Sequence, residues 1–238
     1  MSTETAEPVK VSKLDWLPYV APMAMFLICT SLEDFFPKGQ GGAPHPTWYP
    51  VAYLLKMIVV TGVFLACRST WRDLRSMPSM SGFGLAIALG LGVTGIWVGL
   101  DGHYPAIPLG GSTRASFDPN VLSPLTKIGF LIVRFYGLVL LVPLFEELFW
   151  RSFGIRYVIA PDFENVPIGK VTLRAAVATA VAFALVHPAE WLPAILTGLA
   201  WAWLVHRTKS ITACVVSHAV ANLGLGIYVL ATREWHFW

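Results

Sequence analysis

The chain has 238 residues, of which 55% are hydrophobic and only 13% are charged, and its mean hydropathy is +0.62. Charged residues make up about a quarter of an ordinary soluble domain, so this composition excludes such a domain and indicates an integral membrane protein. The formal net charge of +3 is small and is divided among short loops, which argues against a nucleic-acid partner.

The predicted elements follow a polar N-terminal tail, residues 1–15. Residues 16–124 then form helical spans and loops, and residues 125–232 form a second helical unit. The apolar runs, in chain order, are residues 16–32, 51–67, 83–100, 128–158, 173–186, 192–205 and 211–230. These runs predict an all-α, polytopic transmembrane bundle of seven spans, or of eight if the long run breaks near Pro143.

Some residues in the first spans have simple structural interpretations. Lys56 lies near the start of its span and can extend its ammonium group to the interface, and Arg134 is expected to be an interfacial anchor. Gly95 and Gly99 are four residues apart, a spacing that lets neighbouring helices approach closely.

Lysine and arginine residues gather in the N-terminal tail and in the loops at residues 68–75, 151–170 and 207–209. Basic loops of membrane proteins face the cytoplasm. We therefore expect a cytoplasmic N-terminus.

Two adjacent glutamates, Glu146 and Glu147, interrupt an apolar run. A charged side chain near the bilayer centre costs roughly 2.5–3.5 kcal/mol, so this pair requires cations, water or protons. Glu147 and Arg151 are four residues apart, the spacing at which opposite charges meet on a helix. Neighbouring residues point about 100° apart, so Glu146 can face a cavity and serve as a general base. Alternatively, both glutamates only neutralise Arg151 and Arg156.

Two later apolar segments each contribute a histidine, His187 and His218. Either residue alone is more often a hydrogen-bonded packing residue. Asn222 follows His218 by one helical turn, so an imidazole N–H and an amide N–H can converge on one point. Such donors form an oxyanion hole, in which one donor contributes about 3 kcal/mol. His187 can orient a water molecule or transfer protons.

Three motifs carry a family resemblance. Glu146-Glu147-Leu-Phe-Trp-Arg151 resembles the EExxxR motif, Phe183-Ala-Leu-Val-His187 the FxxxH motif, and His218-Ala-Val-Ala-Asn222 the HxxxN motif of CPBP intramembrane glutamic endopeptidases. This family includes type II CAAX prenyl proteases and bacteriocin-processing enzymes. A fainter similarity links the chain to CAAX-protease-related proteins of exosortase systems. The resemblance covers about residues 130–225, and thus marks the second helical unit as the catalytic core.

The resemblance implies a metal-independent endopeptidase without a cofactor, acting on a membrane-associated protein or peptide in a bacterial inner membrane. It implies that Glu146 activates water, that His187 holds this water, and that His218 and Asn222 stabilise the oxyanion. Glu147 and Arg151 would support the site. It also implies a catalytic cavity that opens toward the cytoplasm.

Other interpretations remain. Two histidines and a glutamate could bind zinc with one open position, although the chain has no HExxH motif. A non-catalytic immunity or scaffold protein could use the same polar cavity to bind a peptide. A proton-coupled transporter is disfavoured because no pair of related halves with broken helices is present.

The predicted topology creates one conflict. If each span crosses the membrane fully, Glu146 and His187 lie at opposite faces, whereas catalysis requires a common depth. We therefore expect a span nearer residues 136–159, and a shifted or kinked helix before His187.

Overall fold

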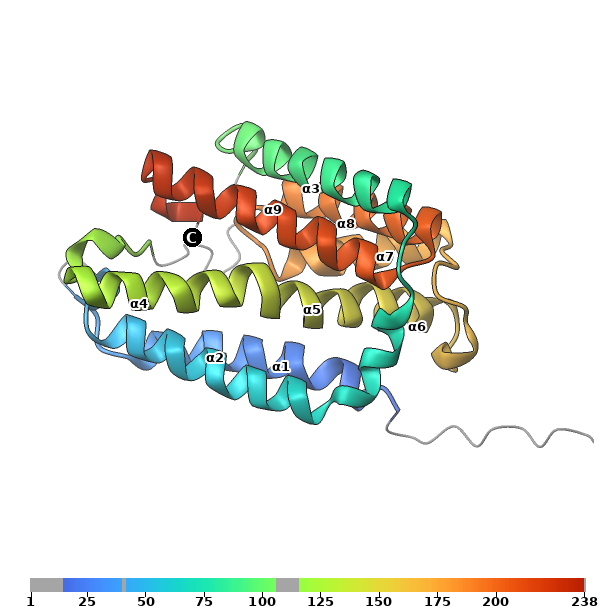
Figure 1. The fold of residues 1–238 in the computed structure, drawn as a ribbon, viewed down its shortest axis with the longest axis horizontal. Helices are drawn as coiled ribbons and strands as arrows, with labels where there is room; N and C mark the ends of the chain where they lie inside the picture. The colour runs from blue at the N-terminus through green and yellow to red at the C-terminus, as the bar shows by residue number, and fades with distance from the viewer. Residues whose placement is uncertain (1–14, 40–41, 106–115, 238) are drawn as a thin grey trace, which may run out of the picture.

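The computed structural model describes residues 15–39, 42–105 and 116–237, and its regular elements are helices (Figure 1). Within these ranges, β-pairing is limited to an isolated bridge between Lys38 and Pro44. The all-α prediction is confirmed. The polar tail predicted at residues 1–15, apart from Asp15, lies outside the described residues.

In the part of the chain that the structure describes, six α-helices surround one long composite helix. They are α1 (Leu17–Leu32), α2 (Trp48–Ala66), α3 (Met80–Leu100), α7 (Leu173–Leu185), α8 (Trp191–Thr208) and α9 (Ile211–Thr232). The composite helix consists of α4 (Pro124–Phe135), the π-helical segment η5 (Tyr136–Leu141), α5 (Val142–Glu147), the π-helical segment η6 (Leu148–Gly154) and α6 (Ile155–Ile159). Short 3₁₀ turns are η1 (Glu33–Phe35), η3 (Arg68–Arg75), η4 (Pro119–Val121), η7 (Phe163–Asn165) and η8 (Trp235–Phe237).

Hydroxyl side chains cap the starts of four helices. The side-chain oxygen of the capping residue accepts a hydrogen bond from the N–H three residues ahead, which satisfies one of the unpaired donors of the first turn. The four capping residues, at α3, α4, α7 and α9, are Ser79, Ser123, Thr172 and Ser210. These caps explain why the helices begin within a few residues of the predicted boundaries.

Among the described residues, four helices are long and apolar enough to cross a membrane. They are Trp48–Ala66, Met80–Leu100, Pro124–Ile159 and Ile211–Thr232. α1 and α7 are apolar but shorter. The protein is therefore an integral membrane protein. The total of seven or eight spans stays a prediction, and the run that an eighth span would divide is one continuous 36-residue helix.

The basic loops meet at one end of the bundle. η3 lies beside the loop after α6, where Arg72 forms an ion pair with Glu164. The turn between α8 and α9 joins them, because Ser76 donates a hydrogen bond to the carbonyl of Lys209 over 2.8 Å. Figure 1 shows η3, α6 and the α8–α9 turn at the same end of the molecule. We call this the basic end.

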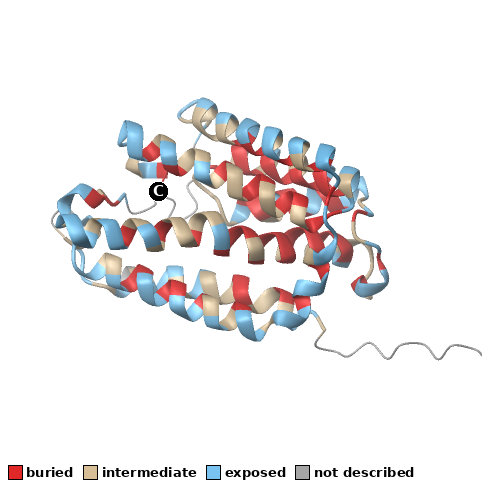
Figure 2. Ribbon diagram, in the orientation of Figure 1, coloured by how far each residue is buried: buried red, intermediate tan, exposed pale blue. Residues whose placement is uncertain are grey.

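A buried polar network closes the basic end. The carboxylate of Asp73 in η3 accepts hydrogen bonds from Tyr19 and from Arg156, both over 2.8 Å, and a third from Ser152. Asp73, Ser152 and Arg156 are all buried. This network ties α1 and η3 to the second half of the composite helix. Figure 2 shows buried residues concentrated in this half of the bundle.

α3 and α9 approach closely at glycines other than the predicted pair. A Cβ atom on Gly90 would lie 2.4 Å from the carbonyl oxygen of Ser217, and one on Gly224 would lie 2.6 Å from Thr94 Oγ1. Nothing lies within 4 Å of a Cβ at Gly95 or Gly99. The expectation for Gly95 and Gly99 is therefore wrong, because the contact face of α3 lies elsewhere.

Candidate active site

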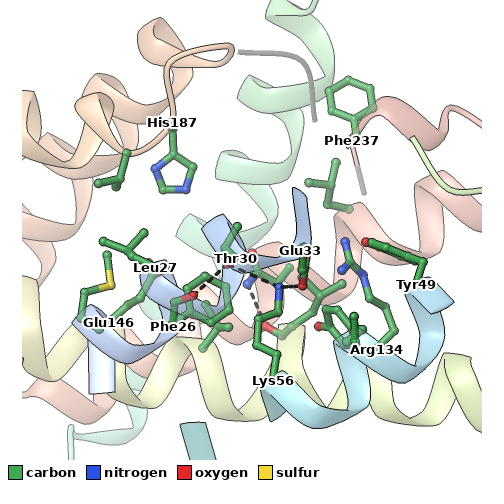
Figure 3. Close-up of a pocket in the computed structure, with 18 of the residues that line it drawn as sticks. Phe26, Leu27, Thr30, Glu33, Tyr49, Lys56, Arg134, Glu146, His187 and Phe237 are labelled. Carbon is green, nitrogen blue, oxygen red and sulfur yellow. Dashed lines mark hydrogen bonds and ion pairs between the residues drawn. The ribbon is translucent and has the colours of Figure 1, made fainter. Parts of the chain in front are cut away.

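A cavity of about 370 Å³ lies between α1, α2, α3, the composite helix, α7, α8 and α9. Its lining includes four of the predicted site residues: Glu146, His187, His218 and Asn222. Glu146 comes from α5, which lies between the two π-helical segments, and its side chain is buried. Figure 3 shows Glu146 and His187 at one part of this cavity. Three separate parts of the sequence thus supply one site.

π-Helical segments flank the two glutamates on both sides. Such segments are rare in proteins and often occur at functional sites, because they interrupt the regular hydrogen-bond ladder. The Leu138 carbonyl in η5 accepts a hydrogen bond from Asn222 Nδ2 over 2.8 Å. The irregular backbone therefore connects the composite helix directly to α9.

Glu147 is fully buried and holds two other site residues. Its Oε2 lies 3.2 Å from Arg151 Nε, which confirms the predicted ion pair. Its Oε1 lies 2.9 Å from His218 Nδ1. Glu147 is not part of the cavity lining, whereas Glu146 is. The two glutamates therefore face different surroundings, as their helical positions predicted.

His218 is fixed by Glu147 and by an aromatic ring. Its imidazole stacks on Trp201 of α8, with ring centres 4.4 Å apart and an interplanar angle of 28°. A carboxylate only accepts hydrogen bonds, so Nδ1 carries the hydrogen in this contact. Nε2 is then an acceptor in the neutral ring, and becomes a donor only when the ring is doubly protonated. The paired N–H donors expected at His218 and Asn222 stay a prediction.

His187 lies just beyond the end of α7. Its Nδ1 lies 2.9 Å from the Phe183 carbonyl oxygen, which can only accept, so Nδ1 carries the hydrogen. Its ring packs edge-on against Trp97, with centres 5.7 Å apart. These contacts orient the imidazole at the cavity wall.

The short α7 removes the conflict over depth. Its 13 residues extend only about 20 Å, less than the roughly 30 Å hydrocarbon core. α8 returns toward the basic end, and a Cβ on its Gly198 would lie 2.8 Å from Ala180 Cα of α7. His187 therefore lies at the tip of a tight hairpin, part of the way along the bundle. We expected a span nearer residues 136–159 and a shifted or kinked helix before His187. The structure instead has one continuous helix, Pro124–Ile159, and α7 ends at Leu185, one residue before the end of the predicted run.

Two buried cations in the same cavity depart from their simple interpretations. Lys56 and Arg134 are both buried and both line the cavity, so neither is an exposed interfacial group. The sequence contained a usable signal, because an ionisable residue inside an apolar helix is a functional candidate by default. No such sequence signal marked Trp201, which stacks on His218.

A metal centre would need several ligands close together. Across residues 15–39, 42–105 and 116–237, no group of three or more His, Cys, Asp or Glu side chains is arranged to hold a metal ion. The described side chains thus provide no ready ligand set for the zinc alternative.

Comparison with known proteins agrees with the site. No curated protein and no solved structure matched the chain. One family model matched residues 128–224, a segment that contains all the predicted site residues. The segment of the chain that builds this site is similar to the Rce1-like family, described as type II CAAX prenyl endopeptidase Rce1-like.

Proposed function

We propose that the protein is an intramembrane endopeptidase that hydrolyses a peptide bond of a membrane-associated protein or peptide. The observation that carries this proposal is the convergence of Glu146, His187, His218 and Asn222 on one buried cavity. The family match of residues 128–224 supports the same reaction class.

In the proposed mechanism, Glu146 takes a proton from a water molecule. The water oxygen attacks the carbonyl carbon of the scissile bond, and a tetrahedral oxyanion forms. The C–N bond then breaks, and Glu146 returns the proton to the leaving amine. His187 holds its Nδ1 hydrogen on a backbone carbonyl, so Nε2 can accept a hydrogen bond from the attacking water.

The oxyanion requires donors on the opposite side of the carbonyl. Asn222 uses one N–H for the Leu138 carbonyl, and its amide has a second N–H that can serve the oxyanion. His218 can serve as a second donor when it is doubly protonated. The Glu147 carboxylate lies 2.9 Å from Nδ1 and fixes the orientation of the ring. Glu147 and Arg151 thus act through His218 as positioning residues.

Comparative terminal proteomics tests this function. Membrane proteins from cells that express the wild type or Glu146→Gln are compared, because Gln keeps the size of the side chain and removes the base. We expect a small set of new termini that are present with wild type and absent with Glu146→Gln. An exposed control, Glu234→Gln, should keep them. Identical termini in all three strains, at equal expression, would favour a binding protein.

The proposal includes the orientation of the protein in the membrane. The basic end carries Arg68, Arg75, Lys170, Arg207 and Lys209, so it should face the cytoplasm, with the N-terminus. The cavity does not reach the basic end. Its most exposed lining residues lie in the second half of α1 and the turn after it: Leu27, Thr30, Pro37 and Lys38. With this orientation, the cavity opens away from the cytoplasm, opposite to the direction that the resemblance implies.

Cysteine accessibility tests the orientation. Lys38→Cys and Arg207→Cys are placed separately in a chain whose native cysteines are replaced, and intact cells receive an impermeant maleimide. Labelling of Lys38→Cys alone is expected. Labelling of Arg207→Cys alone would reverse the orientation and return the cavity mouth to the cytoplasmic side.

A further inference from the structure

His187 lies on a short turn and not on a helix. α7 ends at Leu185 and α8 begins at Trp191, so residues 186–190 between them lack regular helical structure. Within this hairpin, His187 Nδ1 is hydrogen-bonded to the Phe183 carbonyl over 2.9 Å. A ring that orients a reacting water must be held closely in place, because a small displacement of a catalytic group slows a reaction strongly. Neighbouring elements that hold this turn therefore bear on the chemistry.

The end of α3 and the residues after it hold the backbone of this turn. The hydroxyl group of Tyr104 donates a hydrogen bond to the Ala189 carbonyl over 3.2 Å. In the opposite direction, Trp191 Nε1 donates a hydrogen bond to the Pro105 carbonyl over 2.9 Å. The rings of Tyr104 and Trp191 also pack edge to face, with centres 5.9 Å apart. The turn is thus fixed to a segment that is far away in the sequence.

Trp97, in the last turn of α3, contacts the His187 ring itself. The two rings pack edge to face, with centres 5.7 Å apart and an interplanar angle of 86°. Trp97 Nε1 donates a hydrogen bond over 2.9 Å to the Oγ1 of Thr197, a fully buried residue of α8. An indole N–H in an apolar interior needs such a partner, so this bond fixes the orientation of the indole. The fixed indole in turn limits the orientations that the imidazole can adopt.

The position of Trp97 links this contact to the site. Trp97 lines the same cavity as His187 and Glu146, and Figure 3 shows the latter two at one part of it. α3 lies outside residues 128–224, the segment that the family model matches. The first half of the chain therefore reaches the site through α3.

We propose that Trp97, anchored by Thr197, is a positioning residue that keeps the His187 imidazole turned toward the water beside Glu146. This inference rests on the proposed function, because it assigns Trp97 to the same reaction. Trp97 acts on that reaction through His187. Tyr104 supports the same imidazole less directly, through the backbone of the turn.

Cleavage kinetics of the full-length protein test this role. Thr197→Val removes the hydroxyl group that accepts the Trp97 hydrogen bond and keeps the shape of the side chain. It should lower kcat about tenfold and leave KM unchanged, because the ring is misplaced while the substrate still binds. Thr197→Ser restores a hydroxyl group and should restore most of the rate. Thr179→Val removes a buried hydroxyl group that bonds within α7, to the Ala175 carbonyl, and should keep the wild-type rate.

A second background separates positioning from packing. In the His187→Gln protein, Thr197→Val should cause no further loss of kcat, because the ring that Trp97 positions is absent. An equal loss of kcat with and without His187 would overturn the proposal, since the hydrogen bond would then act on the reaction by another route.

NMR spectroscopy of protein with ¹⁵N-labelled histidine, in nanodiscs, reports on the ring without requiring cleavage. The His187 signals are assigned by their absence in His187→Gln. We expect one sharp pair of ring nitrogen signals in the wild type and in Thr197→Ser. Thr197→Val should broaden or double this pair, because the ring adopts more than one orientation. Tyr104→Phe removes one hydroxyl group from a half-buried position, should have a smaller effect of the same kind, and keeps the test available if Thr197→Val fails to fold.

Unchanged His187 signals in Thr197→Val and Tyr104→Phe would overturn the proposal. Altered signals together with a wild-type kcat would also overturn it, because the orientation of the ring would then not affect the reaction. Altered signals in a protein whose wild type cleaves no peptide would support the contact between Trp97 and His187 as the support of the ring and contradict only the proposed function.

Discussion

The basic end and the middle of the bundle place buried acids in different surroundings. At the basic end, Asp73 accepts hydrogen bonds from Tyr19, Ser152 and Arg156, so the protein itself satisfies the carboxylate. In the middle of the bundle, Glu146 lines a cavity that remains open along α1. The first arrangement ties α1 and η3 to the composite helix, whereas the second places a carboxylate at a cavity wall. Burial alone therefore does not identify a catalytic acid.

Glu146 and Glu147 show the same difference within one turn of helix. Glu147 has the same chemistry as Glu146, but its oxygens hold Arg151 and His218. We therefore expect substitution of Glu146 to affect rate and substitution of Asp73 to affect stability. Substitution of Glu147 should affect rate through His218 and stability through the buried pair with Arg151.

The largest expected effect is that of Glu146→Gln on the rate. A positioned general base contributes about 10²–10⁴-fold, so kcat/KM should fall by that factor while the melting temperature stays unchanged. The assay uses the purified protein and a peptide that spans a cleavage site found by terminal proteomics. A variant that retained the wild-type rate would remove Glu146 from the chemistry.

Asp73→Asn should have the converse effect. Breaking a buried charge pair costs about 3–5 kcal/mol, because Arg156 loses its carboxylate partner. Unfolding in detergent should show the loss, while the rate per folded molecule stays near wild type. Glu164→Gln removes the carboxylate of an exposed pair with Arg72 and should cost less than about 1 kcal/mol. Equal costs for the two variants would contradict the assignment of Asp73 to the stability of the basic end.

Glu147→Gln and His218→Gln should each lower kcat/KM by about 10²-fold, since each removes one part of a single donor arrangement. Groups that act as a unit are not additive, so the double variant should be little worse than either single variant. A double-mutant cycle on the same peptide measures the coupling. If the double variant instead lost the product of the two single losses in kcat/KM, Glu147 and His218 would act independently.

A substitution at the contact between α3 and α9 should have a smaller effect, on stability. Gly90→Ala introduces a Cβ 2.4 Å from the Ser217 carbonyl and should cost about 1–3 kcal/mol of stability. Gly95→Ala, with nothing within 4 Å, should be neutral or slightly stabilising. Thermal unfolding of the two variants gives the comparison, and a reversed order would show that α3 contacts α9 through another face.

The smallest expected effect is that of chelation. Exhaustive treatment with a zinc chelator should leave the rate unchanged, because the proposed mechanism takes its proton transfer from Glu146. Activity that is lost on chelation and restored by one equivalent of zinc would reverse the choice in favour of the zinc alternative.

Local signals in the sequence predicted the helices and four residues that line the cavity. Hydrophobic runs mark the helices because they depend on neighbouring residues alone, and the structure adds the capping hydroxyls, such as Ser123 before Pro124. The spacing of Glu147 and Arg151 likewise predicts an ion pair within one helix.

Contacts between helices were less predictable. Whether Arg134 is buried depends on Tyr53 of α2, and whether Gly90 or Gly95 touches α9 depends on the rotation of α3. The depth of His187 depends on where α7 lies along the bundle, which the length of its apolar run does not report. These features arise from packing between distant segments, so no local pattern specifies them.

The central claim concerns what occupies the space beside Glu146. An experimental high-resolution structure in lipid nanodiscs tests it most directly. The account predicts a water molecule within about 3 Å of both the Glu146 carboxylate and the His187 imidazole, with the His218 and Asn222 side chains facing the same space. Apolar side chains packed tightly between Glu146 and the two histidines, with no room for water, would contradict it.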